Sequence, residues 1–576
     1  MDRMPYPTDI STSALKEQVV RTILPRVQTP AQYIGGELNA VQKPVQGLRG
    51  RICLAFPDSY TIGMSHHGLQ VLYAAVNRRA DWACERVFAP GRDLEQLLRQ
   101  AQLPLWSLET FTPLHQFDIV GFSLQYELQA TNVLTILNLG RIPLRSEERT
   151  HADPLVIAGG PCAQNPEPFA EFIDLFVLGD GEESLLELAD GWLQVRSEGG
   201  DRQEQLARLA DRFSYVYVPC LYRPQQDTEG RPLPPAPIRP EARPVVQSAV
   251  LGDLERFPLP TRPVVPHVAA VQDRITLEIM RGCPWRCRFC QSTTLKRPVR
   301  FRTVETILQA AWESYRATGY NEISLLSLST SDYPYFDKLI DRLQAEFRPL
   351  GVSVSVPSLR VNHQWRMLAL QLSTEKHSGL TLAPEAAREE MRRRIGKQIT
   401  NEDLLEGCRQ AFQQGFHRVK LYFMCGLPGE TAEDLAGIVD LAEEIARLGR
   451  QVRGRNVTVT ANVSNFIPKP HTPFQWHGMA SRDYFQEAHR FLRRRVKMRS
   501  VQIKYHDLET SLLEGLISRG DRRLGQVIHR AWQQGARFDA WTDQFQPAIW
   551  QEAIAQSGIN PAWLLHQPYS SDRPLP

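Results

Sequence analysis

Short apolar runs alternate with longer amphipathic stretches between Arg51 and about residue 195. Runs of this kind are typical of buried strands, and the stretches between them repeat apolar residues at helical spacing. The expected strands are Ile52–Phe56, Ile119–Ser123, Leu155–Ala158 and Leu175–Leu178, and the expected helices include Gly68–Arg78, Asp93–Gln102 and Leu128–Leu139. This alternation predicts a parallel sheet with helices on both faces and a ligand crevice at the carboxyl ends of its strands.

A second alternation of the same kind begins at Arg274. Its expected strands are Ile275–Met280, Ile323–Leu328, Val352–Val356, Gly379–Ala383, Val419–Met424 and Val457–Val463. Its expected helices include Val304–Ala317, Tyr335–Phe347, Asn401–Gln414 and Ala432–Leu448. Six such βα units indicate a partial barrel, in which chemistry is expected at the carboxyl ends of the strands.

The chain has 576 residues, too many for one ordinary core, so more than one domain is expected. Prolines are dense between Pro232 and Pro266, which favours a linker. After about Arg490 the pattern becomes helical and charged. The expected division is a lead-in (1–45), a Rossmann-like α/β domain (46–195), a proline-rich linker (196–270), a partial TIM-like (β/α)6 barrel (271–495) and a helical extension (496–576).

Composition and charge set broad limits on the class of protein. The formal net charge is +3, which by itself does not argue for a nucleic-acid partner. No uncharged apolar run approaches the roughly 18 residues of a membrane-spanning helix, and Met1–Ile10 lacks the layout of a secretory signal. We therefore expect a cytoplasmic protein without membrane contact.

Three of the nine cysteines lie close together, in the segment LEIMRGCPWRCRFCQ that follows the first barrel strand. The other six are scattered, and most are expected to be small buried hydrophobic residues. Thiolates suit zinc or iron–sulfur centres. Cys283, Cys287 and Cys290 can bind three corners of a cubane cluster and leave the fourth iron open, as catalysis requires. A zinc knuckle is the alternative, but it needs a fourth ligand that the local sequence lacks; three unrelated thiols are a further alternative.

This segment resembles the signature of the radical S-adenosylmethionine (SAM) superfamily, C-x3-C-x-φ-C, in which φ is aromatic and is Phe289 here. The resemblance implies a [4Fe–4S] cluster whose open iron is chelated by the amino and carboxylate groups of SAM. It implies reductive cleavage of SAM to methionine and a 5′-deoxyadenosyl radical, which abstracts a hydrogen atom. The cofactors carry that chemistry and the protein orients them. An electron donor such as flavodoxin or ferredoxin is expected.

Other strand ends resemble the SAM-binding segments of the same superfamily. After the second barrel strand, Ser329, Ser331 and Asp332 stand where many members have Gly-Gly-Glu. Glu385 ends the fourth strand and resembles the ribose-binding carboxylate, with a helix-terminal glutamate as the alternative. Gly426 and Pro428 match the fifth-strand segment, and residues 466–474 resemble the sixth-strand segment of methylthiotransferase-type members. Phe289 and these strand-end residues are thus expected to contact SAM.

The first α/β domain resembles the cobalamin-binding domains that often precede a radical SAM barrel. The resemblance lies in residues 58–63, 158–161 and 179–183, and tight turns are the alternative explanation for their glycines. The cobalamin contacts that it implies are Tyr60, Gly63, Ser123, Gly159, Gly160, Gly179, Gly181 and Glu182. Tyr60 occupies the position of the usual cobalt-ligating histidine, so we expect no lower histidine ligand from that motif; His66 and His67 follow at a helix start.

Three basic runs could steer an anionic substrate such as RNA. They are residues 281–302, 388–397 and 493–499, and solvated helix faces are the alternative. Trp285 and Trp476 could stack on a base, or pack in the core. The hypothesis from sequence is a cobalamin-dependent radical SAM enzyme that methylates or otherwise modifies RNA or a peptide. The alternatives are a methylthiotransferase-like or other radical enzyme without functional cobalamin, and a non-enzymatic metal-bearing RNA-binding module.

Overall fold

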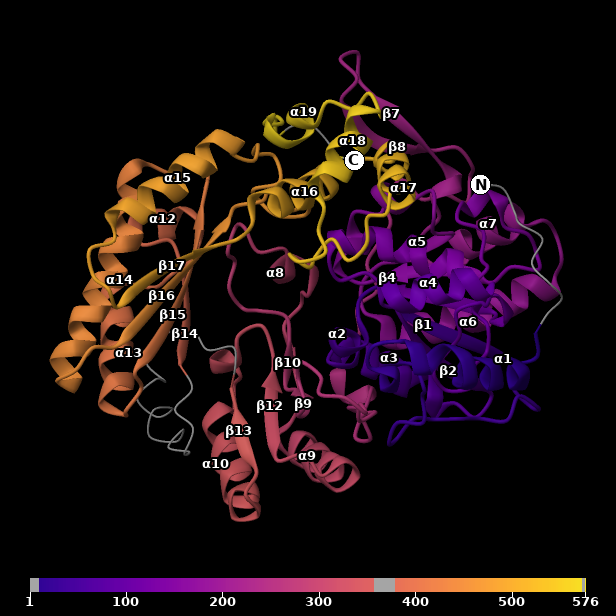
Figure 1. The fold of residues 1–576 in the computed structure, drawn as a ribbon, viewed down its shortest axis with the longest axis horizontal. Coiled ribbons are helices and arrows are strands. Elements are labelled where there is room, and N and C mark those ends of the chain that lie inside the picture. Colours follow the sequence, from indigo (N-terminus) through magenta and orange to yellow (C-terminus); the bar gives the residue numbers. More distant parts are fainter. Residues whose placement is uncertain (1–9, 357–378, 572–574, 576) are drawn as a thin grey trace.

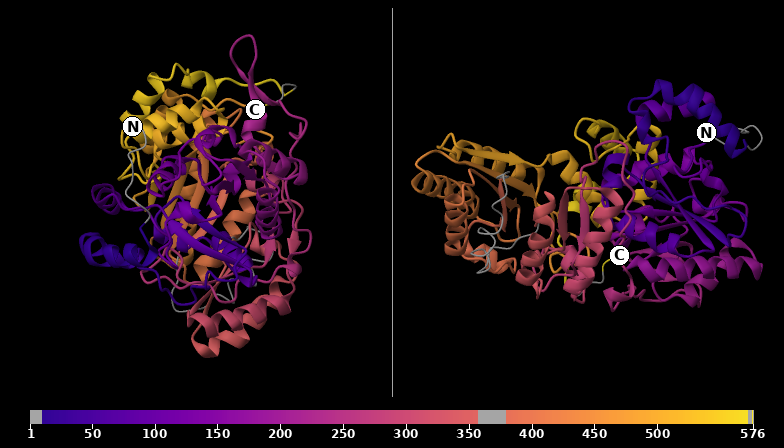
Figure 2. Two further views of the ribbon diagram at one scale, coloured as in Figure 1. Left: turned by 90° about the vertical axis from the view of Figure 1, so that its right-hand side faces the viewer. Right: turned by 90° about the horizontal axis from the view of Figure 1, so that it is seen from below.

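A computed structural model of the chain describes residues 10–356, 379–571 and 575. Figure 1 shows three regions: an N-terminal α/β domain, two further sheets flanked by helices, and a C-terminal set of helices that lies between them. The second view in Figure 2 shows the same order from below. In the described part of the chain, no helix is long and apolar enough to cross a membrane.

The N-terminal domain contains a six-stranded sheet in the order β2-β1-β3-β4-β5-β6. The strands are β1 (Gly50–Phe56), β2 (Trp82–Phe88), β3 (Ile119–Ser123), β4 (Leu155–Gly159), β5 (Leu175–Val177) and β6 (Val216–Tyr217). All neighbouring strands are parallel except β5 and β6. The four predicted strands and the parallel pairing are confirmed.

Helices connect these strands close to where the sequence pattern predicts them. They are α2 (Tyr60–Met64), α3 (His67–Arg78), α4 (Arg92–Ala101), α5 (Ala130–Leu139), α6 (Gly181–Ser197) and α7 (Arg202–Arg212). The predicted domain end at residue 195 falls inside α6, and β6 still belongs to the sheet. That boundary is wrong, because α7 and β6 are needed to complete the sheet.

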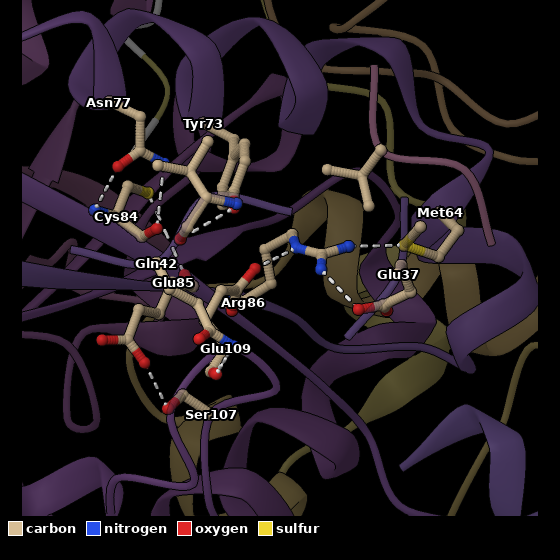
Figure 3. A network of polar contacts seen from close by, with 12 residues as sticks. Glu37, Gln42, Met64, Tyr73, Asn77, Cys84, Glu85, Arg86, Ser107 and Glu109 are labelled. Atoms are coloured by element: carbon tan, nitrogen blue, oxygen red, sulfur yellow. Dashed lines mark hydrogen bonds and ion pairs between the residues drawn. The ribbon is translucent and has the colours of Figure 1, made fainter. Parts of the chain in front are cut away.

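The sequence pattern does not predict β2, since charged residues interrupt it. All of its residues are buried, including Glu85 and Arg86. Figure 3 shows the Arg86 guanidinium between two carboxylates, with Nε 2.6 Å from Glu109 and Nη2 3.1 Å from Glu37. Glu85 accepts from Ser107 at 2.6 Å, also drawn there. Hydrogen-bonded charge pairs of this kind allow a strand with ionic residues to be fully buried.

Replacing Glu109 tests this buried network. Glu109→Ala is expected to lower the free energy of unfolding by about 3 kcal/mol or more, because it removes a partner from a cation with no access to water. Urea denaturation followed by circular dichroism measures the change. Glu305→Ala, which removes an exposed partner of Lys338, is the control and is expected to leave the midpoint unchanged. Equal effects of the two substitutions would contradict the prediction.

The second α/β region consists of two parallel sheets, in the orders β13-β12-β9 and β14-β15-β16-β17. Their strands are β9 (Ile275–Glu278), β12 (Glu322–Leu326), β13 (Ser353–Ser355), β14 (Leu380–Glu385), β15 (Arg418–Cys425), β16 (Thr458–Asn465) and β17 (Val501–Tyr505). Figure 1 draws them as two separate parts of an open barrel. The six predicted strands are confirmed.

β17 corrects the expectation that the chain after Arg490 is helical. It pairs with β16 over Val501–Tyr505, at the edge of the four-stranded sheet. The strand alternates buried or half-buried residues with exposed Gln502 and Lys504. Its short length and its basic surroundings conceal the strand pattern in the sequence.

The remaining helices flank these sheets. They are α8 (Gln291–Leu295), α9 (Val304–Thr318), α10 (Phe336–Phe347), α12 (Glu389–Arg394), α13 (Asn401–Gln413), α14 (Ala432–Arg453) and α15 (Arg482–Arg495). A short antiparallel pair, β10 (Met280–Arg281) and β11 (Arg300–Phe301), encloses the cysteine segment.

The proline-rich segment contains more structure than a linker. After β6 it forms an antiparallel hairpin of β7 (Tyr222–Gln226) and β8 (Pro232–Pro237). It then runs past the first domain, where Ala249 bridges to Gly179. The segment therefore packs along the N-terminal domain.

The C-terminal extension contains α16 (Leu508–Arg519), α17 (Leu524–Gln533), α18 (Pro547–Ala555) and α19 (Pro561–His566). α17 packs against α5 of the first domain. The contact includes a 3.0 Å hydrogen bond from Trp532 to Thr135, and nearby Thr131 donates to Asp539 at 2.6 Å. The extension therefore joins the open barrel to the N-terminal domain.

Candidate functional site

The three clustered cysteines lie on one loop between β10 and α8. Cys283 is buried, Cys287 and Cys290 are half-exposed, and all three are free thiols. The Cys290 N–H donates to the Cys287 carbonyl at 3.1 Å, which folds the loop back on itself. Burial raises the pKa of the Cys283 thiol, while hydrogen bonds from the Trp285 backbone and the Thr293 side chain oppose that rise. Such bonds would stabilise a thiolate.

Most of the cysteines outside the loop are buried, as the sequence predicts. Five of the other six are buried, and Cys220 is exposed. Among the residues the structure describes, no three His, Cys, Asp or Glu side chains are grouped around one metal-ion position. A cubane cluster does not need such a group, because each of its cysteines binds a different iron.

Contacts on two sides hold the cysteine loop between the two barrel sheets. Trp285 Nε1 donates to Asp332 at 2.7 Å, next to the end of β12. On the other side, Arg288 N–H donates to the Ile395 carbonyl at 2.8 Å. Phe289 packs against an apolar cluster that includes Ile395 and Phe466. The loop therefore brings the cysteines to the strand ends of both sheets.

The predicted SAM segments gather around this loop. Ser329 and Ser331 are buried, and the Ser329 hydroxyl donates to Asp332 at 2.5 Å. Asp332 thus bonds both the cysteine loop and its own strand end. Trp285 is half-buried and anchored there, which favours packing over base stacking.

Glu385 is the last residue of β14 and has a φ of 68°, a strained conformation for a residue with a side chain. Its carboxylate lies 3.5 Å from Lys397 Nζ. Burial raises its pKa, and Lys397 opposes the rise. The helix-terminal alternative is wrong, since α12 begins only at Glu389. Strain of this kind clusters at ligand sites.

The segment after β15 turns at Gly426, whose φ is 82°. A Cβ there would lie 2.7 Å from the Phe485 ring, so close packing requires glycine. Pro428 follows in the same turn. The Gly426 N–H donates to Glu430 at 2.7 Å, and the Tyr484 hydroxyl donates to the same carboxylate. Sequence reasoning missed Glu430, because nothing local signals that burial raises its pKa to about 7.

The raised pKa of Glu430 predicts a dependence of stability on pH. A carboxyl group whose pKa is higher in the folded state than in the unfolded state favours folding while protonated. Stability is therefore expected to fall as pH rises from about 4.5 to about 7, by an amount on the order of 3 kcal/mol. Glu430→Gln should match the wild type at pH 5 and exceed its melting temperature at pH 8. Exposed Glu444→Gln is the control, and parallel pH profiles for Glu430→Gln and the wild type would contradict the prediction.

A cavity of about 440 Å³ lies between the first domain and the start of the barrel. Its floor is the carboxyl ends of β1, β3, β4 and β5, and its opposite wall includes Glu278, Met280, Arg281 and Gly282. The size is in the range of sites for organic ligands. Of the predicted cobalamin contacts, those that line this cavity are Ser123, Gly159, Gly160, Gly179, Gly181 and Glu182.

Two cavity glycines are required by contacts within the chain. A Cβ at Gly160 would lie 2.4 Å from the Leu124 carbonyl oxygen, and one at Gly179 would lie 2.1 Å from that of Ala249. Both have positive φ angles, 105° and 104°. Gly159 differs, because a Cβ there would meet only the Val177 carbonyl oxygen, at 3.5 Å. Tight turns therefore explain why residues 160 and 179 are glycines. Both glycines also form part of the cavity wall.

Tyr60 and Gly63 do not line the cavity. Tyr60 is buried, and its hydroxyl donates to Glu37 at 3.1 Å. A Cβ at Gly63 would lie 2.2 Å from the Phe88 ring, so this glycine serves core packing. The structure thus corrects the placement of both residues. His66 and His67 line the cavity instead.

Ion pairs join the cavity wall to the cysteine loop. Arg281 lies 2.5 Å from Glu182, 2.8 Å from Glu278 and 3.1 Å from Asp180. Arg300 lies 2.6 Å from Asp180. All five side chains are nearly excluded from water, so each pairing is stronger than a surface ion pair. The loop at 179–183 of the first domain is therefore bonded to the residue two positions before Cys283.

Several arginines of the first basic run make contacts within the chain. Besides Arg281 and Arg300, Arg302 is buried and donates to the Leu254 carbonyl at 2.5 Å, and Arg297 donates to the Trp285 carbonyl at 2.9 Å. In the other runs, Arg392 is buried and Arg495 lies 2.8 Å from Asp440. In the first run, Arg281, Arg297, Arg300 and Arg302 are thus engaged by contacts within the chain.

Two family models match the sequence. The one described as "Radical SAM proteins, N-terminal" matches residues 68–219, and the one described as "Radical SAM superfamily" matches residues 277–442. The first covers most of the cavity floor, and the second covers the cysteine loop and the segments after β12 and β15.

Curated relatives are similar over different lengths. An uncharacterized protein of Methanocaldococcus jannaschii is 26% identical over 433 residues, which is 75% of this chain and 84% of that protein. The ribosomal protein uS12 methylthiotransferase RimO of Trichodesmium erythraeum is 27% identical over 181 residues, which is 29% of this chain and 39% of that protein.

A solved structure shares the fold. The radical S-adenosylmethionine methyltransferase TsrM of Kitasatospora setae, solved with cobalamin and a [4Fe-4S] cluster bound, superposes with a TM-score of 0.51. The match covers 88% of this chain and all of that one at 15% identity. At this identity the likeness establishes the arrangement of domains.

Proposed function

This chain belongs to the radical SAM superfamily of enzymes, which use a [4Fe–4S] cluster and SAM, and from that premise we propose that it is a cobalamin-binding member that methylates or otherwise modifies RNA or a peptide. The [4Fe–4S] cluster would be held by Cys283, Cys287 and Cys290. Cobalamin would fill the cavity at the carboxyl ends of the N-terminal sheet. As an enzyme of this superfamily, the chain is not the non-enzymatic module that the sequence left open.

One observation carries the proposal: the cavity and the cysteine loop share a wall. Arg281 and Gly282 line the cavity, and Cys283 is the next residue. A ligand of the cavity and a cluster on the loop would therefore be bound by adjoining residues of one segment. Such proximity is what transfer of a group between two cofactors and a substrate requires.

The residues present fit both groups. The loop offers three soft thiol donors, and the buried thiol already accepts hydrogen bonds. When bound, the cluster and SAM supply a 5′-deoxyadenosyl radical, and cobalamin supplies a methyl group. The protein's own part is positional: Asp332 and Ser329 would orient one end of SAM, and Glu385 its ribose hydroxyls. Phe289, Gly426 and Pro428 would close the site around the rest.

The cavity also favours this function over a methylthiotransferase-like activity without cobalamin. Its apolar lining includes Leu54, Phe122, Ile157, Val177 and Met280, with polar groups at intervals. This is the composition expected of a site for an organic cofactor.

Anaerobic reconstitution tests the radical chemistry. The purified chain is expected to hold about four irons with matching sulfide, and to form 5′-deoxyadenosine from SAM with dithionite, flavodoxin or ferredoxin. Stoichiometric zinc without broad visible absorbance would overturn the cluster assignment.

Titration with hydroxocobalamin tests the second cofactor. Binding to the full chain, followed by absorbance after gel filtration, is expected at one per chain. Failure to bind would remove the support for methyl transfer and leave a cobalamin-independent radical enzyme. Recovery of crosslinked RNA or peptide from the intact protein would then distinguish the two substrate classes.

A further inference from the structure

The four-stranded sheet of the open barrel has one apolar face and one polar face. Successive residues of a strand point to opposite faces. In β15 and β16, Val419, Leu421, Val459 and Ala461 are buried in a core cluster that includes residues of α13 and α14. Figure 1 shows these helices on the outer side of the sheet. The residues that alternate with the buried ones therefore point to the inner side, toward the rest of the barrel.

The register of the parallel strands sets polar side chains side by side on this inner face. They form two rows across β15, β16 and β17, which are Lys420–Thr460–Gln502 and Tyr422–Asn462–Lys504. Neighbouring strands lie about 4.8 Å apart, and alternate residues of one strand lie about 7 Å apart. The two rows therefore form one continuous surface, which we call the polar patch.

The polar patch is not used inside the protein. Among the residues that the structure describes, none of its side chains has a hydrogen-bond or ion-pair partner. Lys420, Gln502 and Lys504 are exposed, and Tyr422 is 41% exposed. The basic run around the cysteines is different, since Arg281 and Arg300 there are paired with carboxylates. The donors and acceptors of the patch are therefore available to a ligand.

The polar patch is cationic, and its strands carry no opposing charge. β15, β16 and β17 contain no Asp or Glu. Lys420 and Lys504 occupy diagonal corners of the patch, and Thr460 and Asn462 lie between them. Two unpaired cations that are held apart on one surface complement a ligand with repeated negative charges.

The side chains of the patch match single-stranded RNA. Proteins bind single strands through cations that contact the phosphates and aromatic rings on which bases stack. Tyr422 offers such a ring beside Lys420, and the amides of Asn462 and Gln502 can both donate and accept hydrogen bonds at base edges and 2′-hydroxyls. A peptide that adds to a sheet pairs with an edge strand, whereas the patch is a face. The chemistry therefore favours RNA over a peptide.

The polar patch leads to the cysteine loop. Met424 follows Tyr422 on the same face of β15 and packs against the apolar cluster that also contacts Phe289. Phe289 lies between Cys287 and Cys290. A strand of RNA on the patch would therefore reach the loop that is proposed to hold the [4Fe–4S] cluster.

We propose that the polar patch binds single-stranded RNA as the substrate, with a base stacked on Tyr422 and phosphate groups paired with Lys420 and Lys504. The proposal rests on the proposed function in taking this RNA as the molecule that the radical chemistry modifies. It assigns recognition to side chains outside the three basic runs of the sequence.

The lysines are tested by the binding of a fluorescein-labelled single-stranded oligoribonucleotide to the full chain, followed by fluorescence anisotropy. Lys420→Gln and Lys504→Gln are each expected to weaken binding about fivefold at moderate salt. Each should also reduce the slope of log K against log salt concentration by about 0.7, since one phosphate contact is lost. Lys338→Gln, which removes an exposed cation of α10, is the matched control and should change neither quantity.

The aromatic contact is tested in the same assay. Tyr422→Ala is expected to weaken binding about tenfold, while Tyr422→Phe keeps the ring and should stay within about twofold of the wild type. Phe491→Ala is the control, because Phe491 is 38% exposed on α15 beside the third basic run. In the wild type, ultraviolet crosslinking of 4-thiouridine RNA should label the tryptic peptide 421–447, which contains Tyr422.

Three results would overturn the assignment of RNA to the patch. They are a salt slope unchanged in both lysine variants, equal losses in Tyr422→Phe and Tyr422→Ala, and displacement of the RNA by polyglutamate at equal charge concentration, which would indicate an acidic peptide. Loss of binding in Phe491→Ala instead of Tyr422→Ala would place RNA on α15 and also overturn it. A wild type that binds RNA through the patch but forms no 5′-deoxyadenosine from SAM would overturn the proposed function and leave the binding assignment standing.

Discussion

Cys283→Ala is expected to abolish formation of 5′-deoxyadenosine from SAM. Cys283 is the buried member of the triad, and its sulfur accepts hydrogen bonds from the Trp285 backbone and Thr293. With two cysteines left, a cubane has half of its irons without a protein ligand, and SAM then has no single open iron to chelate. The expected iron content after anaerobic reconstitution is below about one per chain, against about four in the wild type.

The control is Cys220→Ala, which removes an exposed cysteine outside the loop. This variant should keep its iron and its rate of 5′-deoxyadenosine formation. Circular dichroism would establish that both variants are folded. A Cys283→Ala protein that retained wild-type iron and activity would show that the cluster is bound elsewhere.

Lys469→Met is expected to cause the largest loss of stability. Lys469 lies in the loop after β16, and its ammonium group is 2.6 Å from Glu127, 2.8 Å from Glu514 and 3.0 Å from Ser518. These partners belong to the first domain and to α16, so one cation joins three parts of the fold. Its removal leaves two largely buried carboxylates without a counter-ion, which costs about 3–5 kcal/mol.

Thermal and urea denaturation of the full chain measure this effect. Lys338→Met, which removes an exposed cation, is the control and should change stability little. Adding Glu127→Gln to Lys469→Met should restore part of the loss, because one of the two uncompensated charges is then neutral. A double variant less stable than Lys469→Met would contradict this account of the pairing.

The sequence predicts regular elements well where apolar periodicity is undisturbed. β3 is buried along nearly its whole length, and its observed bounds equal the predicted ones. The apolar pattern does not predict β2, because Glu85 and Arg86 lie in its interior. Their partners come from other parts of the chain. A local pattern cannot distinguish a charge that is paired in the core from one that faces water.

The same limit applies to the candidate site. Tyr60 fits the motif position of a metal-ligating histidine, yet α2 turns it toward Glu37 in the core. The basic run before and after the cysteines suggests a surface for an anion, but carboxylates of the first domain neutralise Arg281 and Arg300. Glu430 has an ordinary sequence context and an unusual pKa, because burial, with a smaller contribution from the charge of Asp434, raises it.

The amino-acid sequence alone specifies the chemistry that depends on short spacing: three thiols within one loop, an aromatic residue beside the last, and strands that end near them. Ligand spacing of this kind depends on a few neighbouring residues, so it can be recognised in the sequence before the fold is known. Three features are visible only in the tertiary structure. The cysteine loop shares a wall with a cavity, and His66 rather than Tyr60 lines that cavity. Lys469 joins three parts of the chain. Each of these depends on desolvation and on partners from distant segments, which form only when the sheets and helices pack together.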